Sequence, residues 1–85
     1  MTFSVLVEVS LRPGIADPQG STIERSLPAL GFGGVAGVRV GKAIRFSLEA
    51  ADEVDARRRV EELCQRLLTN PVIEQARMEM EAIAQ

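Results

Sequence analysis

Hydrophobic and polar residues alternate along residues 3–12, so that every second position is apolar. Alternation with a period of two is typical of a half-buried β-strand. Pro13 and Gly14 follow, and the strand is predicted to end there because proline lacks the amide that a strand ladder needs. The apolar face of this predicted strand consists of Phe3, Val5, Val7, Val9 and Leu11.

The same alternation recurs within the stretch 35–49, and its phase survives Gly41 and Lys42, where a turn would be expected. The apolar positions are Val38, Val40, Ile44, Phe46 and Leu48. A two-residue hairpin loop at Gly41 and Lys42 would bring an arginine onto the apolar face, which argues against that register. Two alternatives remain: one long strand bent or bulged at Gly41, or a hairpin with a three-residue loop. Such a loop favours glycine at its last position, where the sequence has Ala43, so we favour the long bent strand.

A first helix is predicted after Asp17 and Pro18, which suit the N-cap and the first helical position. Pro28 removes a backbone hydrogen bond near the other end, so the last turn should kink or the helix should end early. Gly31 is well placed to end the helical segment in a left-handed conformation. The buried stripe of this helix is predicted to be Ile23, Leu27 and Leu30.

A second helix is predicted after Asp52, which can act as its N-cap. Asn70 and Pro71 stop this helix, because the residue before a proline is disfavoured in the α conformation. Apolar and polar residues alternate again from Val72 to about residue 82, which predicts a last strand. The order strand, helix, strand, helix, strand, with both helices on one face of the sheet, predicts an α+β two-layer sandwich.

Size and charge restrict the classes of function. A chain of 85 residues is expected to form one domain that buries only about 60–65% of its unfolded surface, so help from a partner chain is expected. The formal charge of −2 provides no basic field for nucleic acid or an anionic membrane. No apolar run reaches the roughly 20 residues of a membrane span. A single cysteine, Cys64, suits a reducing cytosol, and we expect a cytoplasmic protein.

Catalysis by this chain alone is not expected. The sequence contains no His, Tyr or Trp, and so lacks the commonest general base and metal ligand. Cys64 lies on the apolar stripe of a predicted helix, where a thiol is usually a packing residue. Residues 31–36 match the letters of a dinucleotide-binding fingerprint, but a helix precedes them and a strand follows, the reverse of what phosphate binding requires. We therefore assign no catalytic, cofactor-binding or metal-binding residue.

Three segments contain unusual residues that helix capping and helix termination do not fully explain. They are residues 17–20, 39–42 and 70–73. Within the first of them, Gly20 falls early in a helix, where glycine costs up to ~1 kcal/mol relative to alanine. Close approach of another backbone would explain that glycine.

These segments, in this order and at these separations, resemble the PurS family, the small subunit of formylglycinamidine ribonucleotide (FGAM) synthase in de novo purine biosynthesis. The resemblance implies one PurS-like domain over residues 1–85. It also implies a non-catalytic subunit that joins a large synthetase subunit to a glutaminase subunit. The complex is expected to act as a C–N ligase that uses ATP with magnesium and glutamine, and to pass ammonia between two active sites. The matching text is LRPGIADPQG at 11–20, VRVGK at 38–42 and LLTNPVIE at 67–74.

Together with this resemblance, the stretch 35–49 is expected to link protomers in a homodimer or tetramer. A strand of that length would extend past its neighbours, and pairing with a second copy would cover its open end. The alternative from another class is a small stand-alone α+β ligand-sensing module, which its ligand would stabilise. The candidate subunit-interface residues are Asp17, Pro18, Gln19, Gly20, Arg39, Gly41, Lys42, Arg45, Asn70 and Pro71.

Overall fold

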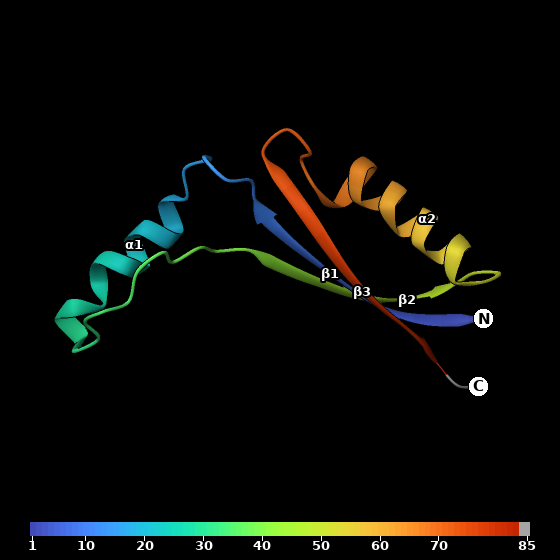
Figure 1. The fold of residues 1–85 in the computed structure, drawn as a ribbon, viewed down its shortest axis with the longest axis horizontal. Helices are drawn as coiled ribbons and strands as arrows, with labels where there is room; N and C mark the ends of the chain where they lie inside the picture. The colour runs from blue at the N-terminus through green and yellow to red at the C-terminus, as the bar shows by residue number, and fades with distance from the viewer. Residues whose placement is uncertain (84–85) are drawn as a thin grey trace.

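The computed structural model describes residues 1–83 as a three-stranded antiparallel sheet with two α-helices (Figure 1). The predicted order of elements and the α+β class are confirmed. A 3₁₀ turn, η1 (Pro28–Leu30), follows the first helix, and a π-helical segment, η2 (Cys64–Leu68), continues the second. The main elements are β1 (Thr2–Leu11), α1 (Pro18–Ser26), β2 (Lys42–Glu49), α2 (Glu53–Leu63) and β3 (Glu74–Ile83).

β1 is the middle strand of the sheet, with β2 on one side and β3 on the other. Its odd-numbered side chains from residue 3 to residue 9 are at most 2% exposed, as the alternation predicted. α2 lies across this face, so the sheet and α2 form two layers with the core between them. The core consists of Phe3, Val5, Val7, Val9, Ala50, Ala56, Val60 and Cys64.

α1 lies beyond the end of the sheet, which corrects the prediction that both helices cover one face (Figure 1). We call residues 12–41 the arm, because they project from the sheet. The chain at 38–41 leads directly into β2 and is hydrogen-bonded to α1, which keeps the helix away from the sheet. The radius of gyration is 16.7 Å, whereas a compact chain of this length would have about 12 Å.

The prediction of one long strand over residues 35–49 is wrong for its first half, because β2 begins only at Lys42. Gly37 has a φ of 71°, which interrupts any extended strand. A hairpin is excluded as well, since β2 pairs with β1 and not with residues 35–41. β2 has 8 residues and its two neighbours have 10 each, so the expected overhang does not exist.

The residues predicted to end the first helix and to begin the second do so in the structure. Pro28 limits α1 to Ser26 and opens the 3₁₀ turn, after which Gly31 adopts the left-handed conformation with a φ of 91°. Asp52 caps α2 by accepting the N–H of Asp55 at 2.8 Å. Within residues 1–83, no helix has the length and hydropathy needed to span a membrane.

Candidate subunit interface

The three unusual sequence segments meet where the sheet joins the arm. β1 ends at this point while β2 and β3 begin there, so residues far apart in sequence lie at one end of the sheet. Residues 17–19, residues 40–42 and Glu74 at the start of β3 line a hollow of about 400 Å³ at this junction. Its polar lining includes Asp17, Gln19, Lys42 and Glu74.

Asp17 connects α1 to the chain that leads into β2. Its Oδ1 accepts the N–H of Gly20 at 2.8 Å as a helix cap, and its Oδ2 accepts the N–H of Val40 at 2.8 Å. The Nε of Arg39 lies 3.9 Å from the same Oδ2. The hydrogen bonds from Gly20 and Val40, with the charge of Arg39, lower the pKa of the Asp17 carboxyl below its ordinary value of 3.8.

Two glycines allow backbones to approach closely at the junction. A Cβ added to Gly20 would lie 2.3 Å from the carbonyl oxygen of Val38. At Gly41 it would lie 2.6 Å from the carbonyl oxygen of Val9. Neither distance leaves room for a side chain, so the expectation that Gly20 marks a close backbone approach is confirmed. Gly41 is similarly required where the chain passes the end of β1.

Asn70 and Pro71 fasten the start of β3 to the end of β1. The carbonyl of Asn70 accepts the N–H of Ile73 at 3.1 Å and that of Glu74 at 2.8 Å. The Nε of Arg12 donates to the carbonyl of Pro71 at 3.0 Å. This loop therefore shapes the same end of the sheet as the other two segments.

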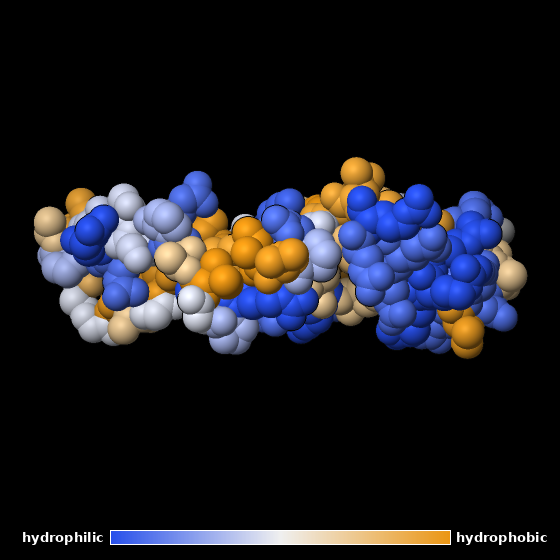
Figure 2. All heavy atoms as spheres, turned by 90° about the horizontal axis from the view of Figure 1, so that it is seen from above, coloured by the Kyte–Doolittle hydropathy of each residue, from blue (hydrophilic) through white to orange (hydrophobic). Residues whose placement is uncertain are grey.

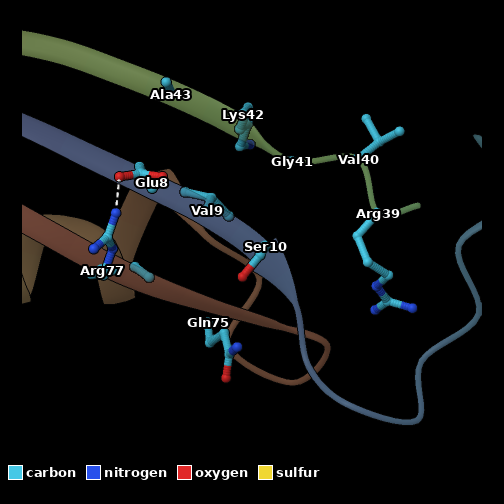
Figure 3. A pocket seen from close by; sticks show the side chains of 11 residues that line it. Glu8, Val9, Ser10, Arg39, Val40, Gly41, Lys42, Ala43, Gln75 and Arg77 are labelled. Carbon is cyan, nitrogen blue, oxygen red and sulfur yellow. Dashed lines mark hydrogen bonds and ion pairs between the residues drawn. The ribbon is translucent and has the colours of Figure 1, made fainter. Parts of the chain in front are cut away.

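A second hollow, of about 550 Å³, lies on the face of the sheet opposite α2 (Figure 3). Arg77 points from β3 to Glu8 of β1, and the two form an ion pair. Arg39 reaches this hollow from the arm, and its Nη1 donates to the carbonyl of Ile15 at 3.2 Å. Lys42 contributes to both hollows, because it stands where the sheet begins.

Of the ten candidate residues, Arg45 lies apart from the junction. It is three residues further along β2 and lines a separate shallow hollow with Leu6 and Glu79. Sequence reasoning missed Glu24, whose Oε1 accepts the N–H of Val38 at 2.9 Å. No sequence signal identified it, because its partner lies 14 residues away along the chain.

The fold is that of a small α+β protein. Its unusual sequence segments shape the surface where the sheet joins the arm, as expected of a subunit that binds other proteins. Residues 4–82 match the model of the PurS family, which is described as phosphoribosylformylglycinamidine (FGAM) synthase. The chain belongs to this family.

Individual relatives agree over nearly the whole chain. The PurS subunit of phosphoribosylformylglycinamidine synthase from Synechocystis sp. is 42% identical over 77 residues, which cover 91% of this chain and 77% of the relative. The Bacillus subtilis subunit is 38% identical over 81 residues, 95% of each chain. The crystal structure of Methanocaldococcus jannaschii PurS matches with a TM-score of 0.85 at 35% identity, over 96% of this chain and 99% of the other. A chain in the structure of PurLQS from Thermotoga maritima matches with a TM-score of 0.87 at 33% identity, over 95% and 99%.

We expect Asp17→Asn to weaken the acid sensitivity of the fold. Because the pKa of Asp17 is lower in the folded chain than in the unfolded one, its carboxylate stabilises the fold above the unfolded pKa. That stabilisation disappears as the pH falls through the folded pKa. Asparagine retains a cap acceptor, but its amide nitrogen cannot accept the N–H of Val40. The variant should melt a few degrees below wild type at pH 7, and the gap should narrow as the pH falls below the ordinary pKa of 3.8 and through the lower pKa of the folded chain.

Thermal melts followed by circular dichroism between pH 2 and pH 7 test this expectation. Asp52→Asn is the matched control, since the Asp52 carboxylate caps its own helix by accepting the N–H of Asp55. A constant difference between Asp17→Asn and wild type across the pH range would contradict the expectation.

Proposed function

We propose that this chain is the non-catalytic PurS subunit of FGAM synthase in de novo purine biosynthesis, and that it joins the synthetase subunit to the glutaminase subunit. The family match over residues 4–82 is the observation that carries the proposal. The similarity to a chain of the PurLQS structure supports a place in a complex of this kind. ATP with magnesium and glutamine are then used by the complex, in the cytoplasm, through its other subunits. Family membership favours this function over a stand-alone ligand-sensing module.

A homo-oligomer is part of this proposal, because the arm carries apolar side chains that the protomer leaves uncovered. We call Ile23, Leu30, Phe32 and Val35 the apolar arm surface; they are 46–70% exposed. Apolar surface of this kind usually marks an interface. Figure 2 shows a further apolar patch in the middle of the molecule, between the arm and the hydrophilic outer face of α2.

The sheet has a second incompletely covered apolar surface beside α2. One helix covers three strands, so the outer strands are less protected than β1. Arms exchanged between two copies would cover both apolar surfaces at once, which makes a dimer the smallest assembly we expect, and a tetramer would be built from such dimers. The half-buried apolar side chains of this face are Ile44, Phe46, Leu48, Met78 and Met80.

Activity of the reconstituted complex tests the proposed function. The synthetase and glutaminase subunits are mixed with and without this chain, and amidine formation is measured with glutamine and, separately, with ammonium. We expect the glutamine-dependent rate to require this chain, because it brings the two subunits together, while the ammonia-dependent rate persists without it. Equal glutamine-dependent rates with and without this chain would contradict the proposal.

A further inference from the structure

β2 is an edge strand, and one row of its backbone groups has no partner in the sheet. Hydrogen-bonded pairs alternate with non-hydrogen-bonded pairs along an antiparallel ladder. The backbone groups of residues 1 and 50 form a hydrogen-bonded pair, through bonds of 3.0 and 2.9 Å. The register between the strands then places the even-numbered residues of β2 in bonds to β1. The odd-numbered residues of β2 therefore direct their amides and carbonyls away from the sheet.

The chain that leads into β2 shows the same alternation, although no strand pairs with it. The amides of Val38 and Val40 donate to the carboxylates of Glu24 and Asp17, at 2.9 and 2.8 Å. These carboxylates belong to α1 and its cap, and α1 lies on the same side of this chain as β1 (Figure 1). The even-numbered amides are therefore occupied on one side of the chain, and the other side stays open.

The odd-numbered residues form one open row along that other side. Within residues 1–83, the backbone groups of Arg39 and Gly41 make no hydrogen bond. An unpaired row of this kind is a template for another strand. We call the row the free edge; it consists of the outward backbone groups of Arg39, Gly41, Ala43, Arg45 and Ser47.

The apolar side chains beside the free edge restrict how another strand can approach it. Ile44 and Phe46 are half-buried and pack against the core on the side of α2. By alternation Val38 and Val40 belong to the same face, and both are half-buried as well. Ile23 of α1 lines a hollow of about 450 Å³ together with Val40, so α1 borders this face too. A strand added to the free edge should therefore continue the apolar face on the side of α2.

β3 of a second copy is one candidate, because it carries Glu79 and Glu81 on its polar face and Met78 and Met80 on its apolar face. With both α2 helices on the same side, however, β3 can only run parallel to β2. Such a contact is heterologous, so the β2 edge of the second copy stays open and further copies add to it. All arms would also project from the same end of the extended sheet, where none covers the apolar face of a neighbour. Pairing with β3 therefore leaves uncovered the surfaces that the oligomer has to cover.

The free edge of a second copy gives a closed arrangement. Half a turn about an axis perpendicular to the sheet brings two free edges together in antiparallel order, with both α2 helices on the same side. The contact is isologous and complete with two copies. The odd-numbered backbone groups of each copy then face the odd-numbered groups of the other. The rotation also places the arm of each copy beside β2 of the other, so that α1 can cover apolar side chains that α2 leaves half-buried.

The side chains favour a register centred on Gly41. With Gly41 opposite Gly41, Val38 opposes Ile44 on the apolar face, and Arg39 opposes Ala43 on the polar face. Apolar pairs stabilise a ladder, whereas like charges directly opposite each other destabilise it. This register has apolar pairs and places no cation opposite another cation.

Other registers pair the side chains less well. A shift by one residue would exchange the two faces of one strand and set apolar side chains against polar ones. A shift by two residues in one direction would set Lys42 opposite Lys42 and Arg39 opposite Arg45. The same shift in the other direction would set Val38 opposite Lys42.

We propose that two copies of this chain pair their free edges in antiparallel order around Gly41, over residues 38–44, and that the arms are exchanged across this ladder. Gly37, with its φ of 71°, ends the extended segment, which leaves Arg45 and Ser47 outside the ladder. Strand addition obtains its affinity from main-chain hydrogen bonds. Because carboxylates of α1 and its cap hold the arm extended beside β2, little order has to be gained on binding. The inference rests on the homo-oligomer of the proposed function and names its interface.

Ala43→Pro tests the inference by removing an amide that the ladder uses. Proline is tolerated in an edge strand where its nitrogen faces away from the sheet, so the protomer should keep its fold. Symmetry removes the hydrogen bond from both copies, so the dissociation constant should rise at least about tenfold. Ser47→Pro is the matched control, because it removes an outward amide of the same edge outside the ladder. Light scattering over a range of concentrations should show a lower mass for Ala43→Pro and the wild-type mass for Ser47→Pro.

Amide hydrogen exchange of the wild-type chain gives a measurement that does not depend on any substitution. At concentrations where the chain oligomerises, we expect the amides of residues 39, 41 and 43 to exchange at least about tenfold more slowly than those of residues 45 and 47. Dilution to the protomer should remove this difference.

The exchange of β3 distinguishes its edge from the free edge. The outward amides of β3 are even-numbered, because β1 bonds β3 through the residues that it does not use for β2. Slow exchange of these amides, together with those of residues 45 and 47, would show that β2 pairs with β3 of another copy and would overturn the inference.

These experiments separate the two proposals. If the wild-type chain is a protomer at every concentration, the proposed homo-oligomer fails and the inference fails with it. If the wild-type chain oligomerises while the amides of residues 39, 41 and 43 exchange as fast as in the protomer, the inference alone is overturned. The same holds if Ala43→Pro folds and keeps the wild-type mass throughout the dilution series. The activity of the reconstituted complex decides the role as a synthase subunit separately.

Discussion

Gly20→Ala is expected to destabilise the protein more than any other single methyl addition in the arm. The new Cβ would stand 2.3 Å from the carbonyl oxygen of Val38, and the neighbouring Asp17 Oδ2 would be at 2.8 Å. Neither atom is the free end of a flexible chain, so α1 must move away from residues 38–41. Overpacking of this kind costs about 1–3 kcal/mol. For a domain of this size that corresponds to a fall in melting temperature of roughly 5–20 °C.

Gly33→Ala provides the matched control, because nothing lies within 4 Å of the methyl group it would add. We expect the control to stay within about 0.5 kcal/mol of wild type. Denaturant midpoints measured by circular dichroism compare the two variants. Equal midpoints would show that α1 does not rest on residues 38–41 in solution.

Ile23→Asp is expected to dissociate the homo-oligomer. The side chain of Ile23 is 46% exposed in the protomer and belongs to the apolar arm surface. If a second copy buries this surface, the new carboxylate loses its hydration without gaining a partner. An uncompensated buried charge costs about 3 kcal/mol or more, which weakens the dissociation constant at least about 100-fold.

Light scattering over a range of protein concentrations measures this effect. The control is Val54→Asp, which places a carboxylate on a side chain that is 77% exposed on α2, outside the arm. We expect Val54→Asp to keep the wild-type mass and Ile23→Asp to approach the protomer mass. The same mass for both variants would exclude the apolar arm surface from the interface.

The strands were predictable because each has one buried face. The alternation over residues 3–12 became Thr2–Leu11, and that from residue 72 onward became Glu74–Ile83. The early end of α1 was predictable from Pro28, since proline disturbs a helix through local geometry alone. The sequence indicated that another backbone segment lies close to Gly20, but it did not identify that segment as the one containing Val38.

Residues 35–41 misled the prediction for a physical reason. Val38 and Val40 alternate in phase with β2, but the carboxylates of Glu24 and Asp17 rather than a strand bind their amides. Periodicity of hydrophobic residues indicates which side chains are sheltered and does not identify the element that shelters them. The position of α1 was unpredictable for the same reason, because it depends on hydrogen bonds across 14 and 23 residues of sequence.

The double role of Asp17 has a consequence for the folding of the arm. One carboxylate starts α1 through Gly20 and also holds Val40 against the helix. Fraying of the first turn of α1 therefore releases the chain leading into β2, and release of that chain removes one of the two hydrogen bonds that hold the Asp17 carboxylate in its capping position. The helix and the extended segment beside it thus open and close as one cooperative unit, with a single opening free energy.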